Sequence, residues 1–198
     1  MKIKLIYNPR AGESGGKLAA IKQFFPHLDI YRTHNGEKTI IEVRRTRARY
    51  DLIIAAGGDG TINEVTNGLI GGSTPLAILP LGTVNVVARE LGIPLDLHSA
   101  LEVIAKNKIR SIDVGRANKR YFLLCCGIGL DAHVIDDVGN PSLFKQMVFL
   151  SSFLKKSVTH ENATLHTTIA RENNHAKMIV VSNMSRYAGD MIMGQHIR

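Results

Sequence analysis

The sequence of 198 residues has no tryptophan, only two cysteines and only six prolines. The two cysteines are neighbours, Cys125 and Cys126. Adjacent cysteines rarely bridge each other and no CxxC pair is present to bind zinc, so we expect two buried, reduced thiols in a cytoplasmic protein. The N-terminus enters a strand without a signal-peptide pattern, and no apolar run approaches the roughly 18 residues that span a bilayer. Any membrane contact should therefore be peripheral.

Common hydrolase and metal-centre motifs are also missing. The eight histidines are scattered without HExxH or comparable spacing, and no GxSxG nucleophile elbow occurs. No residue is therefore predicted as a metal ligand. The net charge of +8 is consistent with anionic ligands. Because no nucleic-acid-binding module accompanies this charge, nucleic acid is not the expected partner.

What the chain does contain is typical of an α/β protein, with 44% hydrophobic residues and 18 glycines. In the first half, apolar runs alternate with segments of helical periodicity. This alternation predicts βαβ units and an open parallel sheet with flanking helices. The expected strands are 2–8, 28–33, 51–56 and 75–80, and the expected helices are those around 17–25, 37–48, 61–69, 84–91 and 97–104.

One glycine-rich turn organises this half. Gly57, Gly58 and Gly60 surround Asp59, after an apolar strand and before a helix. We expect the glycines to adopt positive φ or admit a close neighbour, and Thr61 to cap the helix. Unpaired amides and the positive end of the helix dipole would then face an anion, most simply phosphate. Asp59 either serves that ligand or bonds its own backbone as a turn former.

Two further loops also follow strands, at 8–17 and 81–85. The first is not a Walker A loop, because the spacing from Gly12 to Lys17 is one residue short and Leu18 replaces the Ser or Thr that binds magnesium. In open parallel sheets ligands bind beyond the carboxyl ends of the strands, so all three loops can share one cleft.

After residue 108 the pattern becomes β-rich, with strands expected at 109–116, 121–128, 164–170 and 178–183 and one helix around 144–155. We therefore divide the chain into a nucleotide-binding α/β domain, 1–110, and a β-rich domain, 111–198. Arg44, Arg45, Arg47 and Arg49 cluster near the end of one helix, where a solvated basic face is expected.

Three stretches together resemble the diacylglycerol kinase catalytic domain family, which includes bacterial lipid kinases and sphingosine kinases. They are YNPRAG at 7–12, GGDGT with Asn63 and Glu64, and LPLGTVN at 79–85. The resemblance continues through 112–115, 127–131 and 182–183. GGDGT alone is shared with NAD kinases. The resemblance implies ATP and Mg²⁺ as cofactors, a site between an α/β domain and a β-sandwich, and γ-phosphoryl transfer to a lipid hydroxyl in phospholipid metabolism.

The resemblance also assigns residues. Asp59 matches an aspartate given either to a magnesium and water network or to proton transfer, and is the predicted catalytic residue. The predicted nucleotide-binding residues are Asn8, Pro9, Arg10, Ala11, Gly12, Thr33, Gly57, Gly58, Asp59, Gly60, Thr61, Ile62, Asn63, Glu64 and Thr83.

The sequence departs from the family pattern in two places. Val86 stands where an aspartate usually follows Asn85, which removes part of the magnesium network. The family's later Asp-Gly-x-Leu and Asp-Gly-Glu segments have no counterpart before Arg198. From this we expect an incomplete sandwich domain whose exposed apolar face favours association, with a homo-oligomer as one outcome. If the sequence is complete, we also expect a retained nucleotide site with weak or no kinase activity.

Three alternatives remain open at this point. An NAD kinase-like enzyme shares the glycine turn, a non-catalytic nucleotide-binding remnant would bind ATP without turnover, and a nucleic-acid binder would lose affinity steeply with salt.

Overall fold

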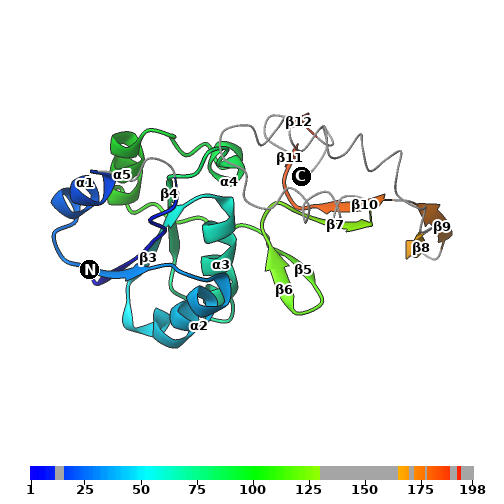
Figure 1. The fold of residues 1–198 in the computed structure, drawn as a ribbon, viewed down its shortest axis with the longest axis horizontal. Coiled ribbons are helices and arrows are strands. Elements are labelled where there is room, and N and C mark those ends of the chain that lie inside the picture. The colour runs from blue at the N-terminus through cyan, green and yellow to red at the C-terminus, as the bar shows by residue number, and fades with distance from the viewer. Residues whose placement is uncertain (12–15, 130–164, 170–171, 177, 188–190, 193–198) are drawn as a thin grey trace.

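The computed structural model describes residues 1–11, 16–129, 165–169, 172–176, 178–187 and 191–192. Its first half is built on a parallel four-stranded sheet in the order β2-β1-β3-β4 (Figure 1). The strands are β1 (Ile3–Tyr7), β2 (Leu28–Arg32), β3 (Leu52–Gly57) and β4 (Leu76–Pro80). The open parallel sheet predicted from the alternating pattern is confirmed.

Helices cover both faces of this sheet. They are α1 (Lys17–Phe24), α2 (Gly36–Thr46), α3 (Asp59–Leu69), α4 (Val86–Glu90) and α5 (Leu97–Ala105), with a short 3-10 turn, η1 (Arg47–Arg49), after α2. The side chains of Asn35 and Asp96 cap α2 and α5 by accepting backbone N–H bonds. Figure 1 shows α1 and α5 together on one side of the sheet and α2 and α3 on the other.

Successive side chains of the two central strands, β1 and β3, point to opposite faces of the sheet, so each face has its own hydrophobic core. Leu5 of β1 and Ile54 of β3 pack with Ile21 and Leu101 toward α1 and α5. The alternate residues of both strands form the second core with α2, α3 and α4, including Ile6, Ile53, Val43, Ile62 and Val87. A strand buried on both faces reads as a continuous apolar run, which is why these segments were recognisable in the sequence.

Buried Lys4 is the exception within β1. Its ammonium group pairs with Glu42 of α2 and donates to Thr46 Oγ1 at 3.0 Å. A buried charge is tolerated only when it is paired in this way.

The described residues of the second half form small antiparallel strand pairs. They are β5 (Gly115–Ala117) with β6 (Arg120–Phe122), β7 (Cys125–Gly129) with β10 (Met178–Ser182), β8 (Leu165–Ile169) with β9 (Glu172–Ala176), and β11 (Arg186–Tyr187) with β12 (Met191–Ile192). The β-rich character predicted for this half is confirmed. The helix predicted around 144–155 lies outside the described residues.

Several predictions of detail were wrong. Residues 109–114 form no strand: most of the segment is exposed, including Ile109 and Ile112, and of its apolar residues Val114 alone packs against the second core. The strand predicted at 121–128 is divided between β6 and β7. Cys125 and Cys126 are reduced but half-buried, since the two-stranded β7–β10 pair does not enclose both of its faces.

Polar side chains tie the second half to the first. The side-chain amide of Asn67, in α3, pairs with the backbone of Tyr121, in β6. Its Oδ1 accepts from the Tyr121 N–H at 2.9 Å, and its Nδ2 donates to the Tyr121 carbonyl at 2.8 Å. Glu90 of α4 accepts from the Ser185 backbone N–H at 3.1 Å and from its hydroxyl at 2.7 Å. Within the second half, the Asn183 side chain donates to the Leu123 carbonyl at 3.0 Å. Backbone groups that would otherwise lack a partner are thereby satisfied.

The Arg47 side chain is not part of a solvated basic face, contrary to the expectation from its charged neighbours. Its Nη1 donates to the carbonyls of Gly68 and Leu69 at 2.9 and 2.8 Å and to that of Ile70. These carbonyls end α3, where the helix leaves its acceptors unpaired and where positive charge is favourable. Arg44 and Arg45 remain exposed.

We predict that Arg47→Ala lowers the free energy of unfolding by about 1–3 kcal/mol, since partly buried carbonyls lose their donor. Urea unfolding followed by circular dichroism measures the change. Arg44→Ala, in the preceding helix α2, is the matched control and should stay within about 0.5 kcal/mol of the parent. Equal losses for both variants would contradict the capping role of Arg47.

Candidate functional site

The predicted loops meet at one edge of the sheet, where the carboxyl ends of its strands lie. Backbone bonds extend the ladder past each strand: the Thr33 N–H donates to the Tyr7 carbonyl, the Asn8 N–H to the Ala56 carbonyl, and the Leu81 N–H to the Gly57 carbonyl, each at 2.9 Å. We call this edge, from Thr33 through residues 8–11 and 57–61 to residues 81–85, the loop rim. In parallel sheets such an edge is where ligands bind.

Close contact between the second and third loops requires two of the glycines. A Cβ placed on Gly82 would lie 2.5 Å from Gly58 Cα, closer than any real contact. The expectation of positive φ at this turn was wrong, since Gly58 has φ −90° and ψ −175° and neither Gly57 nor Gly60 has positive φ. The close neighbour that the glycines admit is the backbone of the third loop.

The carboxylate of Asp59 joins the same two loops. Its Oδ2 accepts from the Val86 N–H at 3.1 Å and its Oδ1 from the Val87 N–H at 2.9 Å. These amides begin α4, so they have no partner within the helix. Asp59 is half-buried and bonds a distant backbone, 27 residues along the chain, rather than its own turn.

Asn85 shapes the third loop from within. It is buried and has a left-handed backbone, φ 52° and ψ 51°, which asparagine tolerates better than most residues. Its Oδ1 accepts from the Gly82 N–H at 2.9 Å, and its Nδ2 donates to the Gly82 carbonyl at 2.8 Å. The loop is therefore held closed by one side chain.

The first loop is attached to the second by Asn8. Its Nδ2 donates to Thr61 Oγ1 at 3.0 Å, and its Oδ1 accepts from the Arg10 N–H at 2.9 Å. Thr61 is not the helix cap, because α3 begins two residues earlier, at Asp59. Its side chain faces inward to Asn8 and lies over Gly57, where a Cβ would be 2.5 Å from Thr61 Oγ1.

The remaining predicted residues have varied surroundings. Arg10 and Thr83 are exposed, Pro9 is half-buried, and Ala11, Thr33 and Ile62 are buried. Gly12 lies outside the described residues. Asn63 has a buried side-chain oxygen, Oδ1, with no hydrogen-bond partner among the described residues. An unpaired buried oxygen is costly, so Asn63 is a candidate contact for a water molecule or ligand.

Glu64 points from α3 to the start of α2. A Cβ on Gly36 would lie 2.6 Å from Glu64 Oε1, so glycine at that position leaves room for the carboxylate. Burial raises the pKa of Glu64, although nearby Arg120 and Thr39 oppose the shift. A carboxylate that is held at a cost in stability is a common mark of a functional position.

Some residues of the site were not predicted. The amides of Val86 and Val87 and the side chain of Asn67 have no signature in a single sequence. Asn67 lies on the other side of α3 from the apolar face of Ile62, Val65 and Leu69, so helical spacing gave no reason to expect it in a contact.

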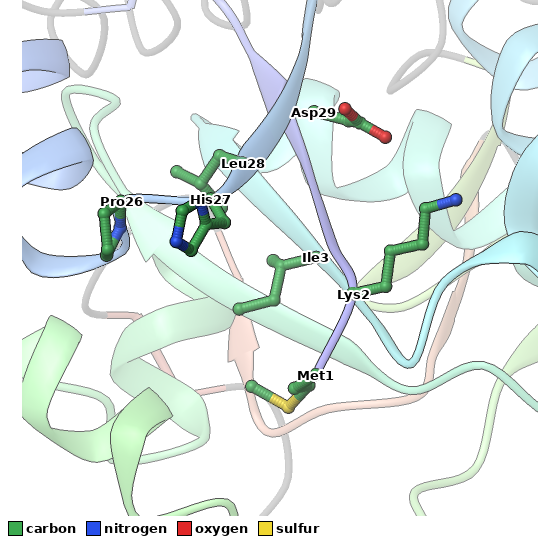
Figure 2. Close-up of a pocket in the computed structure, with 7 residues that line it drawn as sticks. All are labelled: Met1, Lys2, Ile3, Pro26, His27, Leu28 and Asp29. Carbon is green, nitrogen blue, oxygen red and sulfur yellow. The ribbon is translucent and has the colours of Figure 1, made fainter.

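Two other features lie apart from the loop rim. Within the described part of the chain, no group of three or more His, Cys, Asp or Glu could hold a metal ion. An open hollow of about 620 Å³ is lined by seven residues, drawn as sticks in Figure 2: Met1, Lys2, Ile3, Pro26, His27, Leu28 and Asp29. These residues lie at the amino-terminal ends of β1 and β2, opposite the edge where the glycine loops gather.

The comparison that decides the family is a match between residues 2–117 and the model of the diacylglycerol kinase catalytic domain. The chain belongs to this family. The matched region includes the whole parallel sheet and the loop rim.

Several bacterial diacylglycerol kinases are similar to this chain in sequence or in structure. Diacylglycerol kinases of Staphylococcus saprophyticus and Staphylococcus aureus MRSA252 are each 37% identical over 131 residues, which is 62% of this chain and 43% and 42% of theirs. The chain thus spans less than half the length of these relatives. A crystal structure of a diacylglycerol kinase from Bacillus anthracis is 31% identical with a TM-score of 0.73, covering 95% of this chain and 66% of that one.

We predict that Asp59→Ala destabilises the chain by about 1–3 kcal/mol, because the amides of Val86 and Val87 lose their acceptor. Thermal unfolding measures the effect. Asp113→Ala removes an exposed carboxylate and is the control. A melting temperature for Asp59→Ala that equals that of the control would mean that this carboxylate does not fasten the loops.

A second prediction concerns pH. The pKa of the Glu64 carboxyl is raised above 4.5 in the folded chain, so the folded state binds the carboxyl proton more tightly than the unfolded state does. The free energy of unfolding therefore falls as the pH rises from 4.5 through the pKa of the folded state. Glu64→Gln removes this loss, so the variant should be more stable than the parent at pH 7, with the advantage shrinking below pH 4.5. Urea midpoints across pH 4–8 test this, and a pH-independent difference would contradict it.

Proposed function

We propose that the loop rim binds the phosphate groups of ATP, and that the protein containing this chain transfers the γ-phosphoryl group to the hydroxyl of a lipid such as diacylglycerol. The observation that carries the proposal is the meeting of three strand-end loops around the start of α3. The names of the similar bacterial enzymes support the acceptor, since each is called a diacylglycerol kinase.

The start of α3 suits a polyphosphate. No side chain caps this helix, so its first amides, those of Asp59, Gly60 and Thr61, have no side-chain acceptor. Gly60 is exposed, and a Cβ built on it meets nothing within 4 Å. Open space beside unpaired amides at the positive end of a helix dipole is a favourable anion site.

The rim is also fixed in advance of binding. The contact of Gly58 with Gly82, the Asn8–Thr61 bond and the Asp59 bonds to α4 hold the loops against each other. Phosphoryl transfer depends mainly on positioning and electrostatic stabilisation, so groups that need no reorganisation on binding are an advantage.

The described residues do not fit a resident magnesium site. Both oxygens of Asp59 accept backbone amides, Val86 offers no carboxylate, and no cluster of three acidic, histidine or cysteine side chains is found in the described ranges. ATP would bring Mg²⁺ on its own phosphates, as is usual for kinases.

In this proposal residues 1–110 form the nucleotide-binding domain, and residues 111–198 belong to the domain that binds the lipid. Among the described helices, none is long and apolar enough to cross a bilayer.

We predict that Gly60→Leu weakens ATP binding at least tenfold while the melting temperature stays equal or rises. The added side chain occupies the space beside the α3 amides, and leucine favours a helix more than glycine by roughly 1 kcal/mol. Isothermal titration of ATP into the chain, with and without Mg²⁺, measures the affinity.

Ala105→Leu is the matched control, since it adds three of the same four side-chain carbons at an exposed position of α5. Its ATP affinity should equal that of the parent. Equal affinities for the parent and Gly60→Leu would exclude phosphate binding at the start of α3.

A further inference from the structure

Two exposed histidines face each other at the β8–β9 hairpin, which lies at the end of the long axis opposite α1 and α5 (Figure 1). His166 of β8 and His175 of β9 are directly opposed in the antiparallel register. Their ring centroids are 4.6 Å apart with an interplanar angle of 83°. Spacing along the sequence gave no sign of this pair, because strand pairing alone brings the two residues together.

We propose that this pair chelates a divalent cation of the late first transition series, such as Cu²⁺ or Ni²⁺. The proposal is independent of the nucleotide site. Neutral imidazole nitrogens suit these metals and not Mg²⁺, which prefers oxygen ligands. Within the described ranges no third His, Cys, Asp or Glu completes a cluster, so water would fill the remaining positions.

The distance between the two ring centroids favours one coordination geometry of the metal. With a metal–nitrogen distance of about 2.0 Å, each ring centroid lies about 3.2 Å from the metal, so ligands at a right angle have centroids about 4.5 Å apart. A tetrahedral angle needs about 5.2 Å. The observed 4.6 Å matches the right angle, which is typical of square-planar or octahedral Cu²⁺ and Ni²⁺ rather than tetrahedral Zn²⁺.

The pair is also free to adopt the chelating orientation. Strand pairing fixes the distance between the two Cβ atoms, whereas rotation of each ring about χ2 is soft and both rings are exposed. A bound metal would connect β8 to β9 and stabilise the hairpin by its binding free energy.

Isothermal titration of Ni²⁺ into the full chain tests the proposal. His166→Gln and His175→Gln should each weaken binding by about 100-fold, since a chelate loses its second, intramolecular contact. His27→Gln removes an exposed histidine from the opposite end of the chain and should leave the affinity unchanged. Because both rings of the pair are exposed, melting temperatures of all variants in EDTA should equal that of the parent.

Electron paramagnetic resonance with one equivalent of Cu²⁺ provides a second measurement. The parent should show two coordinated imidazole nitrogens, and either single variant only one. Unchanged Ni²⁺ affinity in His166→Gln, an equal loss in His27→Gln, or single-nitrogen coordination in the parent would each overturn the proposal.

Discussion

The contact on which the loop rim depends is the bond of one carboxylate to two backbone amides. Asp59 begins α3, and its oxygens accept the first amides of α4. Each carboxylate oxygen therefore offsets an unpaired helix donor, and the charge lies at the positive ends of two helices. The Asp59 bonds hold the second and third loops together, and the absence of a Cβ at Gly58 and Gly82 gives their backbones room to touch.

Beneath the rim, the sheet provides a rigid support. β1 and β3 are buried on both faces, so their carboxyl ends cannot shift without disturbing two cores at once. Arg47 and Asn67 both fix the C-terminal end of α3: Arg47 binds its last carbonyls, and Asn67 attaches β6 to its last turn. The start of α3 is then the part with unpaired amides, and it is directed at the rim.

The sequence predicted those features that depend on local pattern. Apolar runs such as 51–56 and helical spacing such as Ile62, Val65 and Leu69 identified the strands and helices of the first half, and strand-end glycines indicated the rim. Features set by tertiary contacts were missed or wrong: the inward-facing Thr61 and the capping Arg47 depend on residues far along the chain, and the His166–His175 pair depends on the register of two strands. Residues 109–114 were mistaken for a strand because their β-branched composition carries no information on whether a core is available.

Amide exchange of the chain, followed by mass spectrometry or NMR with and without ATP, tests the central claim most directly. If polyphosphate binds the loop rim, the amides of Asp59, Gly60 and Thr61 should exchange more slowly or shift on ATP addition, whereas those of His27, Leu28 and Asp29 beside the hollow of Figure 2 should not change. An unchanged first turn of α3 at saturating ATP, or protection confined to the hollow, would contradict the account.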